Sequence, residues 1–377
     1  MPVFIGGTLP PITICELYPA PFQKPIGNDC MSKRKLTRRQ AWRIQKVQDE
    51  RTARAAKRDS KAQDQLLEGD LGPEQHGLVI AHYGTQVSVE ALEGDNQGQV
   101  CRCYMRANLG SIVTGDKVVW RAGTAAQGSG DSLGVIVAVL DRHSELSRPD
   151  PYGDMKTVAA NIDRIVIVVA PYPEPHGNLI DRYLVAAETL DIQPIILLNK
   201  VDRIDDSNQQ RLAEMQQRYT ELGYEWLNAS TMTEQGLTEL IEYLADYTSV
   251  FVGQSGVGKS SLINMLLPNQ NIRVGPLSEI SQQGTHTTTT AHLFHFPAGG
   301  HLIDSPGIRE FGLWHMDEQS LLEGFVEFRP FLGYCKFRDC AHQSEPGCAI
   351  QKALEEGHIS STRMASFRYI LSTLDNP

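Results

Sequence analysis

The stretch with the most distinct chemistry is a glycine-rich loop, G-x-x-x-x-G-K-S, between an apolar run at residues 249–252 and a helix-like segment at 262–267. Its glycines let backbone N–H groups curl around phosphate oxygens, and the N-terminus of the next helix adds partial positive charge. Lys259 can reach the β- and γ-phosphates of a nucleotide, and the Ser260 hydroxyl can bind Mg²⁺. This context favours a P-loop over an ordinary glycine-rich turn. The expected nucleotide contacts are Gly253, Gln254, Ser255, Gly256, Val257, Gly258, Lys259, Ser260 and Ser261.

A second loop, Asn199-Lys200-Val201-Asp202, follows the strand-like residues 194–198. Ligands of open α/β sheets bind at this carboxyl edge of the strands. The Asp202 carboxylate can accept hydrogen bonds from the N1–H and N2–H₂ donors of guanine, whereas adenine would leave it unpaired. Asn199 can hold the loop and reach the base edge, and the Lys200 stem can lie over the ring. Together with a P-loop, this N-K-x-D sequence predicts a guanine site.

A third loop comes after the strand-like residues 225–227 and contains Ala229 and Ser230. Their backbone N–H groups could face the guanine O6 atom, which would make both residues part of the nucleotide site. The alternative is an ordinary turn between a strand and a helix.

The phosphate side is completed by a threonine-rich loop at residues 284–290 and by the sequence D-x-P-G, which begins at Asp304 after a short strand. A carboxylate in this position acts near Mg²⁺, and the Gly307 N–H can touch the γ-phosphate. We expect Thr288 to complete the Mg²⁺ coordination with Ser260, and Thr289 is the alternative.

The residue that positions the attacking water is not the usual one. GTPases that use glutamine carry it directly after the D-x-x-G glycine, but here that position is Ile308, which cannot orient water. His286, beside the threonines, could do so through an imidazole nitrogen. The alternative is a histidine that packs the loop or meets RNA. The predicted catalytic residues are therefore His286, Lys259 and Thr288.

The order of these motifs is unusual, because the guanine loop precedes the P-loop by roughly fifty residues. In an ordinary GTPase the phosphate loop comes first. The chain is therefore predicted to be circularly permuted, an arrangement that keeps the site but moves the chain ends to its switch side.

Three cysteines and a histidine gather within fourteen residues near the C-terminus. Such thiolate and imidazole ligands suit a tetrahedral, structural Zn²⁺ with no vacant position for catalysis. We expect one zinc ion per chain, and a fourth ligand elsewhere in place of the histidine is the alternative. The expected ligands are Cys335, Cys340, His342 and Cys348.

Three sets of elements must position these residues. Short alternating strands at 78–81, 87–92, 100–105, 117–120 and 134–140 indicate a small five-stranded barrel, either an OB-fold or an SH3-like barrel. From residue 161 onward, buried apolar strands alternate with helices, which predicts a parallel α/β sheet. Residues 350–374 have the pattern of one or two helices.

Composition indicates a chain of ordinary globular character, with 377 residues, 41% apolar and 21% charged. It has no apolar stretch of about 20 residues for a membrane span and no signal-peptide pattern, so we expect a cytoplasmic protein. Residues 33–61 hold twelve basic and three acidic residues, a charge of +9 in a chain whose net charge is -10. Such an arm is either a solvated tail or a contact for nucleic-acid phosphates.

These motifs resemble the circularly permuted, ribosome small-subunit-dependent GTPases of bacteria. The matching segments are 31–36, 113–120, 161–163, 181–184, 199–202, the P-loop, 284–289, 304–311 and 335–340. The resemblance implies an OB-fold domain, a permuted GTPase domain and a zinc-containing helical domain. It also implies a monomer that binds the small ribosomal subunit and its rRNA late in maturation and hydrolyses GTP to GDP and phosphate under stimulation by that subunit.

The expected domains are a non-native or unstructured extension (1–30), a basic, partly helical or disordered arm (31–74), the RNA-binding OB-fold (75–150), the permuted GTPase (151–318) and the zinc-binding helical domain (319–377). One rival is a nucleotide kinase, but no acceptor site is evident in the sequence. The other is an RNA-binding scaffold without turnover, against which Lys259, Ser260 and Asp304 argue.

Overall fold

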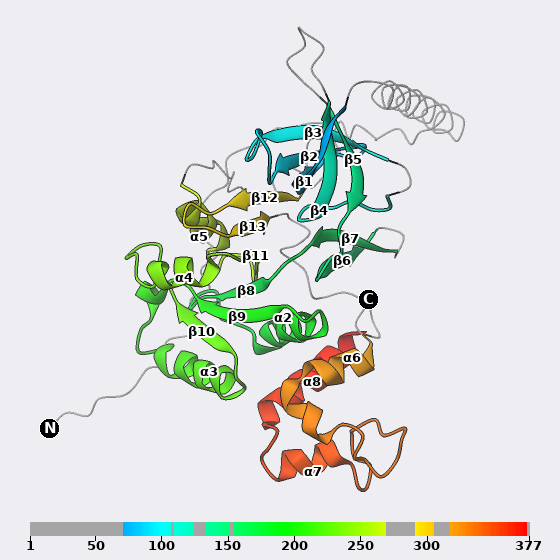
Figure 1. Cartoon of the computed structure of the whole chain (residues 1–377). Coiled ribbons are helices and arrows are strands. Elements are labelled where there is room, and N and C mark those ends of the chain that lie inside the picture. Colours follow the sequence, from blue (N-terminus) through cyan, green and yellow to red (C-terminus); the bar gives the residue numbers. More distant parts are fainter. Residues whose placement is uncertain are drawn as a thin grey trace, which may run out of the picture. The chain divides into compact units, whose positions relative to one another are not determined.

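The computed structural model describes residues 71–106, 109–123, 133–150, 154–268, 291–304 and 317–374 (Figure 1). The chain divides into two compact units, Met1–Arg58 and Asp59–Pro377, and the described residues all belong to the second. The predictions for the first thirty residues and the basic arm lie outside the described residues. None of the helices that the structure describes has the length and apolar character needed to cross a membrane.

The first five strands close into a barrel, as predicted. They are β1 (Leu71–His82), β2 (Gln86–Ala91), β3 (Val100–Met105), β4 (Lys117–Gly123) and β5 (Gly134–Val139). Their order is β1-β2-β3-β5-β4, and β4 pairs back with β1. Only β3 and β5 pair in parallel, which favours the OB-like arrangement over an SH3-like barrel. The alternation of apolar residues buries Val79, Val89 and Trp120 inside the barrel.

Barrel strand β1 begins at Leu71, seven residues before the predicted strand. Its first half contains Leu71, Gly72 and Pro73 and no buried residue, so it lacks the alternation on which the prediction depended. Gly77 within it is needed for packing, because a Cβ atom there would lie 2.4 Å from Val89 Cγ1. After the barrel, a hairpin of β6 (Glu145–Pro149) and β7 (Met155–Ala160) forms a separate two-stranded sheet, which the sequence pattern did not reveal.

The α/β region contains a six-stranded stretch of sheet in the order β10-β9-β8-β11-β13-β12. Its strands are β8 (Arg164–Val169), β9 (Gln193–Leu198), β10 (Glu225–Asn228), β11 (Thr248–Val252), β12 (His292–His295) and β13 (His301–Asp304). All neighbours pair in parallel except β12 with β13. Every residue of β8 is buried, because helices cover both faces of the sheet.

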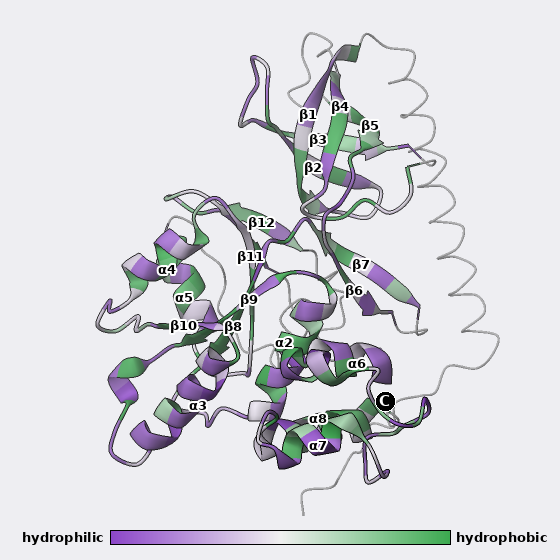
Figure 2. Cartoon of the chain, turned by 60° about the horizontal axis from the view of Figure 1, so that its bottom comes forward, coloured by the Kyte–Doolittle hydropathy of each residue, from purple (hydrophilic) through white to green (hydrophobic). Residues whose placement is uncertain are grey.

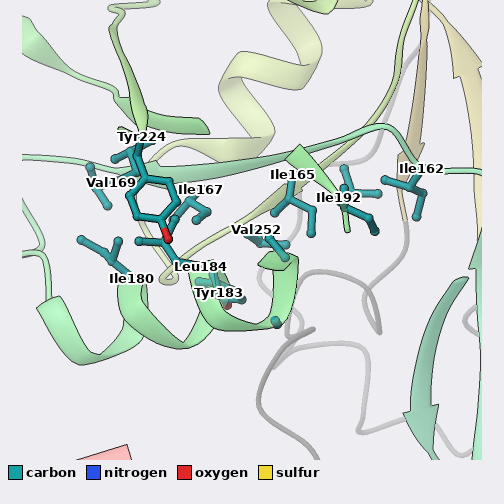
Figure 3. Packing of buried hydrophobic residues seen from close by; sticks show 14 of the residues in the cluster. Ile162, Ile165, Ile167, Val169, Ile180, Tyr183, Leu184, Ile192, Tyr224 and Val252 are labelled. Carbon is teal, nitrogen blue, oxygen red and sulfur yellow. The ribbon is translucent and has the colours of Figure 1, made fainter. Parts of the chain in front are cut away.

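The covering helices are α2 (Gly177–Thr189), α3 (Gln209–Glu221), α4 (Leu237–Leu244) and α5 (Lys259–Leu266). Residues of α2 and α3 share one apolar core with alternate residues of the strands, and residues of α4 and α5 share a second. Figure 3 shows the first core, where Ile180 and Leu184 of α2 pack near Ile165 and Ile167 of β8. Figure 2 shows that α3 is largely hydrophilic, as expected of a helix that buries only a narrow stripe.

The barrel and the α/β sheet are hydrogen-bonded to each other. Strand β1 pairs in antiparallel fashion with β12, with Ala81 opposite His292. Beside this pair, the Thr114 hydroxyl donates to the carbonyl oxygen of Ala291 at 2.9 Å. One continuous sheet of eleven strands therefore runs from β10 into the barrel.

The C-terminal region is helical, as predicted. Its elements are α6 (Glu318–Gly324), the 3₁₀ helix η3 (Val326–Phe331), α7 (Ala349–Glu355) and α8 (Ser361–Leu374). Asp317 caps α6 by accepting from the Ser320 amide at 2.7 Å. The core contains the rings of Phe325, Phe328 and Phe367, and Phe367 packs edge-on against the other two. Both α6 and α8 contact α2 of the α/β region (Figure 1).

Candidate nucleotide site and metal centre

The P-loop connects β11 to α5, as its sequence predicts. Gly253 and Gly258 have φ values of 129° and 96°, a backbone conformation that favours glycine. A Cβ atom at Gly253 would lie 2.2 Å from the Val168 carbonyl oxygen, and one at Gly258 would lie 2.4 Å from Asn199 Nδ2. Both glycines are therefore required by close approach of the chain as well as by φ.

Lys259 is the first residue of α5, and its ammonium group turns back over the loop. Nζ donates to the carbonyl oxygens of Gly253 at 2.6 Å and Gln254 at 2.8 Å. These bonds hold the positive charge at the N-terminus of α5, where phosphate binding needs it.

The guanine loop follows β9 and is bonded directly to the P-loop. Asn199 is fully buried, and its Nδ2 donates to the Val257 carbonyl oxygen at 2.9 Å. Its Oδ1 is buried and has no hydrogen-bond partner among the described residues. Lys200 adopts a left-handed backbone, with φ of 60°, and its Nζ donates to the Gly256 carbonyl oxygen at 2.5 Å. Burial lowers the pKa of Lys200 from its usual value.

The carboxylate of Asp202 is solvent-exposed and is held from one side. The Ser230 hydroxyl donates to Asp202 Oδ1, and the same hydroxyl accepts from the amides of Met232 and Thr233 at 3.2 and 3.3 Å. Ser230 is fully buried, so it holds the exposed carboxylate from the protein interior. The sequence predicted a backbone contact from Ser230 to guanine, whereas in the structure its side chain holds Asp202.

The amides of the third loop have partners that the sequence did not predict. The Ala229 N–H donates to the Leu198 carbonyl oxygen at 2.8 Å, and the Ser230 N–H donates to that of Gln235 at 3.0 Å. The next amide, of Thr231, has no acceptor among the described residues. Thr231 is therefore the first residue after β10 whose N–H is not used by another described residue.

Tyr172 is a further residue at this junction that sequence motifs did not indicate. Its carbonyl oxygen accepts from Lys200 Nζ at 3.4 Å, and its phenol oxygen lies 3.1 Å from Ser207 Oγ. It thereby links the segment after β8 to the guanine loop. Only the structure brings Tyr172 and Lys200 together, because 28 positions separate them.

The side of the site that is predicted to bind Mg²⁺ is described in part. Asp304 is the last residue of β13 and lies opposite His292 of β12. Burial lowers the pKa of His292, and the charge of Asp304 opposes that shift. Of the remaining predicted residues, His286, Thr288, Thr289 and Gly307 lie outside the described residues.

The predicted metal ligands come together. One donor atom from each of Cys335, Cys340, His342 and Cys348 lies within 4.8 Å of all the others. Cys335 Sγ is 3.5 Å from His342 Nδ1 and 3.9 Å from Cys348 Sγ, and His342 Nδ1 is 3.4 Å from Cys348 Sγ.

These separations fit a tetrahedral zinc ion. Zn–S bonds of about 2.3 Å and Zn–N bonds of about 2.0 Å place neighbouring ligand atoms about 3.5 to 3.8 Å apart. The sulfur atoms also accept backbone hydrogen bonds, from the Ala349 amide to Cys335 at 3.3 Å and from the Gln351 amide to Cys348 at 3.4 Å. Such bonds orient the two sulfur atoms toward the centre of the cluster. The four residues therefore form a cluster that suits one zinc ion.

Comparison with known proteins adds a family match and close relatives. The RsgA GTPase family model matches residues 139–314. Small ribosomal subunit biogenesis GTPase RsgA of Hahella chejuensis is 59% identical over 344 residues, covering 91% of this chain and 97% of the relative. The protein of the same name from Azotobacter vinelandii is 60% identical over 347 residues, covering 92% and 99%.

Two solved structures are similar to this one. YjeQ from Thermotoga maritima is 30% identical, with a TM-score of 0.65, over 81% of this chain and all of that one. YloQ, a circularly permuted GTPase, is 28% identical, with a TM-score of 0.62, over 81% of this chain and 96% of that one. The predicted permuted order of guanine loop and P-loop is confirmed.

Proposed function

Because the chain belongs to the RsgA GTPase family of P-loop enzymes that hydrolyse GTP, we propose that it acts on the small ribosomal subunit late in its maturation, under stimulation by that subunit. The relatives are named for small ribosomal subunit biogenesis, and the matches span more than nine-tenths of both chains. We place this activity in the cytoplasm and assign it to a monomer.

The observation that carries the proposal is the bonding of the barrel to β12. The pair Ala81 and His292, and the bond from Thr114 to Ala291, fix the residues that directly follow the threonine run at 285–290. That run contains the proposed Mg²⁺ ligand and the proposed water-positioning histidine. RNA bound to the barrel can therefore act on the strand that leads out of the catalytic loop.

Surface features of the helical domain support contact with RNA. Tyr334 is 78% exposed and Phe337 45% exposed, beside the zinc cluster. The Lys336 ammonium lies 5.5 Å from the centroid of the Phe337 ring, and Arg338 is also exposed. Exposed rings next to basic side chains suit unpaired bases and their phosphates. With the basic arm, they give the chain two places to meet rRNA.

In the proposed reaction, water attacks the γ-phosphorus, the bond to the β–γ bridging oxygen breaks, and GDP and phosphate leave. Lys259 and the P-loop amides bind the phosphates. Asn199, Lys200 and Asp202 bind the guanine, and the Thr231 N–H donates to O6. His286 orients the water, and the Gly307 N–H contacts the γ-phosphate.

Two metal ions belong to this proposal. Mg²⁺, when bound, neutralises charge that develops on the phosphates. Ser260 and Thr288 would hold it, with Asp304 nearby. One structural Zn²⁺ would be held by Cys335, Cys340, His342 and Cys348, whose arrangement fits it.

The test is GTP turnover with and without purified small ribosomal subunits, with large subunits as the control. We expect stimulation by small subunits alone. His286→Ala should lose most of this stimulation and keep its GTP affinity, because the residue acts on the water. Equal turnover with and without small subunits would contradict the proposed partner. Full stimulated turnover in His286→Ala would contradict the proposed role of His286.

A further inference from the structure

The segment 181–184 stands out in the sequence, yet none of its residues is assigned a contact with the nucleotide. Asp181 lies on α2 and is only 2% exposed. Its Oδ1 accepts from the Tyr219 hydroxyl of α3 at 2.7 Å and from the Arg363 guanidinium of α8. A buried carboxylate needs partners of this kind, so Asp181 ties together two helices of the GTPase region and one of the helical domain.

Arg363 is the centre of this network. It is 1% exposed, and it binds both oxygens of Glu327, through Nε at 2.6 Å and through NH2 at 3.1 Å. Its guanidinium also lies 4.3 Å from the centroid of the Phe325 ring. Burial would lower the pKa of Arg363, but Asp181 and Glu327 outweigh it and raise that pKa, so the side chain stays charged.

Apolar packing surrounds these charges. Val185 of α2 belongs to the core of the helical domain. A Cβ atom at Gly324 of α6 would lie 2.3 Å from Val185 Cγ1, so the two helices touch with no space for a larger side chain. At the rim, Arg329 pairs with Glu188 at 2.7 Å, and Arg182 donates to the Thr373 hydroxyl.

The same helix reaches the P-loop on its other side. Residues Leu179, Ile180 and Tyr183 of α2 line a small pocket together with Gly253 and Val257 of the P-loop. Helix α2 therefore borders the same space as the phosphate-binding loop, and through Asp181 and Val185 it contacts the helical domain.

Charge burial of this kind is not needed for stability, because apolar residues of similar size at such positions are often as stable or more so. What a forked guanidinium between two carboxylates adds is geometry, since the planar group fits bidentate partners in one orientation. We propose that Arg363 is a positioning residue that fixes the helical domain in a single orientation on α2, so that a partner held by that domain is placed relative to the P-loop.

The test compares three variants. In Asp181→Leu/Glu327→Met/Arg363→Met every charge of the network is replaced by an apolar side chain. Arg363→Lys keeps the charge and loses the fork. Lys352→Met removes an exposed pair with Glu356 on α7 of the same domain and serves as the matched control.

The triple variant should fold, keep its zinc, and keep the GTP affinity and turnover of the unstimulated protein. Amide hydrogen exchange in α2 and η3 should rise, and turnover stimulated by small ribosomal subunits should fall about tenfold, the size of a typical coupling between sites. Arg363→Lys should show the same rise in exchange and the same fall in stimulated turnover, with unchanged zinc content. Lys352→Met should change neither exchange nor stimulated turnover.

The turnover part of this test rests on the proposed function, whereas the hydrogen-exchange part does not. If small subunits fail to stimulate the unmodified protein, the proposed function is lost and hydrogen exchange alone decides the role of Arg363. If exchange in α2 and η3 is unchanged in the triple variant, or in Arg363→Lys should the triple variant not fold, Arg363 fixes no orientation and the proposal is wrong.

Discussion

The nucleotide site and the cysteine–histidine cluster are built in opposite ways. In the first, backbone conformation sets the geometry: Gly253 has φ of 129° directly after β11 and approaches Val168 of the fully buried β8, and Gly258 has φ of 96° and approaches Asn199 after β9. In the second, four side chains converge from residues 335–348, and apart from Cys348, which caps α7, these lie in turns without a long helix or strand. One site takes its shape from a sheet, and the other is formed by a loop.

This difference indicates what each site needs in order to exist. Packing of the sheet offsets the entropy cost of ordering the P-loop, whether or not nucleotide is bound. A loop of this length has too few buried contacts to fix four ligands, so metal binding supplies the missing free energy. Four measurements test this contrast, and they follow in order of decreasing effect.

Removing zinc should affect one region and spare the other. Binding of Zn²⁺ to such ligand sets contributes roughly 10 kcal/mol to the free energy of folding. A strong chelator, or Cys340→Ser, should therefore bring amide exchange in α7 close to that of an unfolded chain, while α5 stays protected. Protection of α7 that survives metal removal would show that the cluster folds without its ion.

Changing the backbone of the P-loop should have the reverse pattern. In Gly258→Ala the new Cβ atom meets Asn199 Nδ2 at 2.4 Å at a φ of 96°. We expect GTP binding to weaken by about 3 kcal/mol, the upper range for backbone strain at a functional site. Zinc content should not change.

The control for this variant is Gly223→Ala. Gly223 has a similar φ of 89°, but no atom lies within 4 Å of the added Cβ. It should lower the free energy of unfolding by about 1 kcal/mol and leave GTP affinity intact. Equal GTP affinities in the two variants would mean that contact with Asn199 is unimportant.

Asp202→Asn should weaken GTP binding by about 2 kcal/mol, because an amide cannot accept from both guanine donors as a carboxylate does. The preference for GTP over ATP should fall with it, as measured by competition binding. Asp206→Asn removes the same charge at an exposed neighbour and should leave both quantities unchanged. An Asp202→Asn protein with full selectivity would place guanine recognition elsewhere.

The smallest effect is expected for Ser230→Ala. It removes the hydroxyl that holds Asp202 and accepts the amides of Met232 and Thr233. We expect GTP binding to lose about 1 kcal/mol, the net value of one hydrogen bond. Thr233→Ala, an exposed position in the same turn, is the control and should bind GTP normally. Matching affinities for the two variants would mean that Asp202 needs no support.

The sequence predicted the features that depend on residues close together in the chain. The P-loop, the guanine loop and the zinc ligands each lie within fourteen residues, so their spacing carries the chemistry. Strand β8 was predicted at its full length, because a run of β-branched residues marks a strand buried on both faces.

Features that depend on distant residues were not accessible in the same way. The support of Asp202 by Ser230 joins positions 28 apart, and the bond from Arg363 to Asp181 joins positions 182 apart. The hairpin β6–β7 has a mixed polar pattern and half-buried residues, so it gives no clear period. The amides of Ala229 and Ser230 were expected at the base, but pairing of the strand end and the following turn uses both.

The pairing of β1 with β12 also bears on solubility. A sheet edge with unpaired N–H and C=O groups is a template for another chain, and proteins shorten, charge or cover such edges. Here β10, at one edge of the α/β stretch, has only four residues and begins with the exposed Glu225, whereas the start of β12 is covered by the barrel. The barrel thus protects the GTPase sheet from edge-to-edge aggregation, and a GTPase region expressed without it should associate through β12.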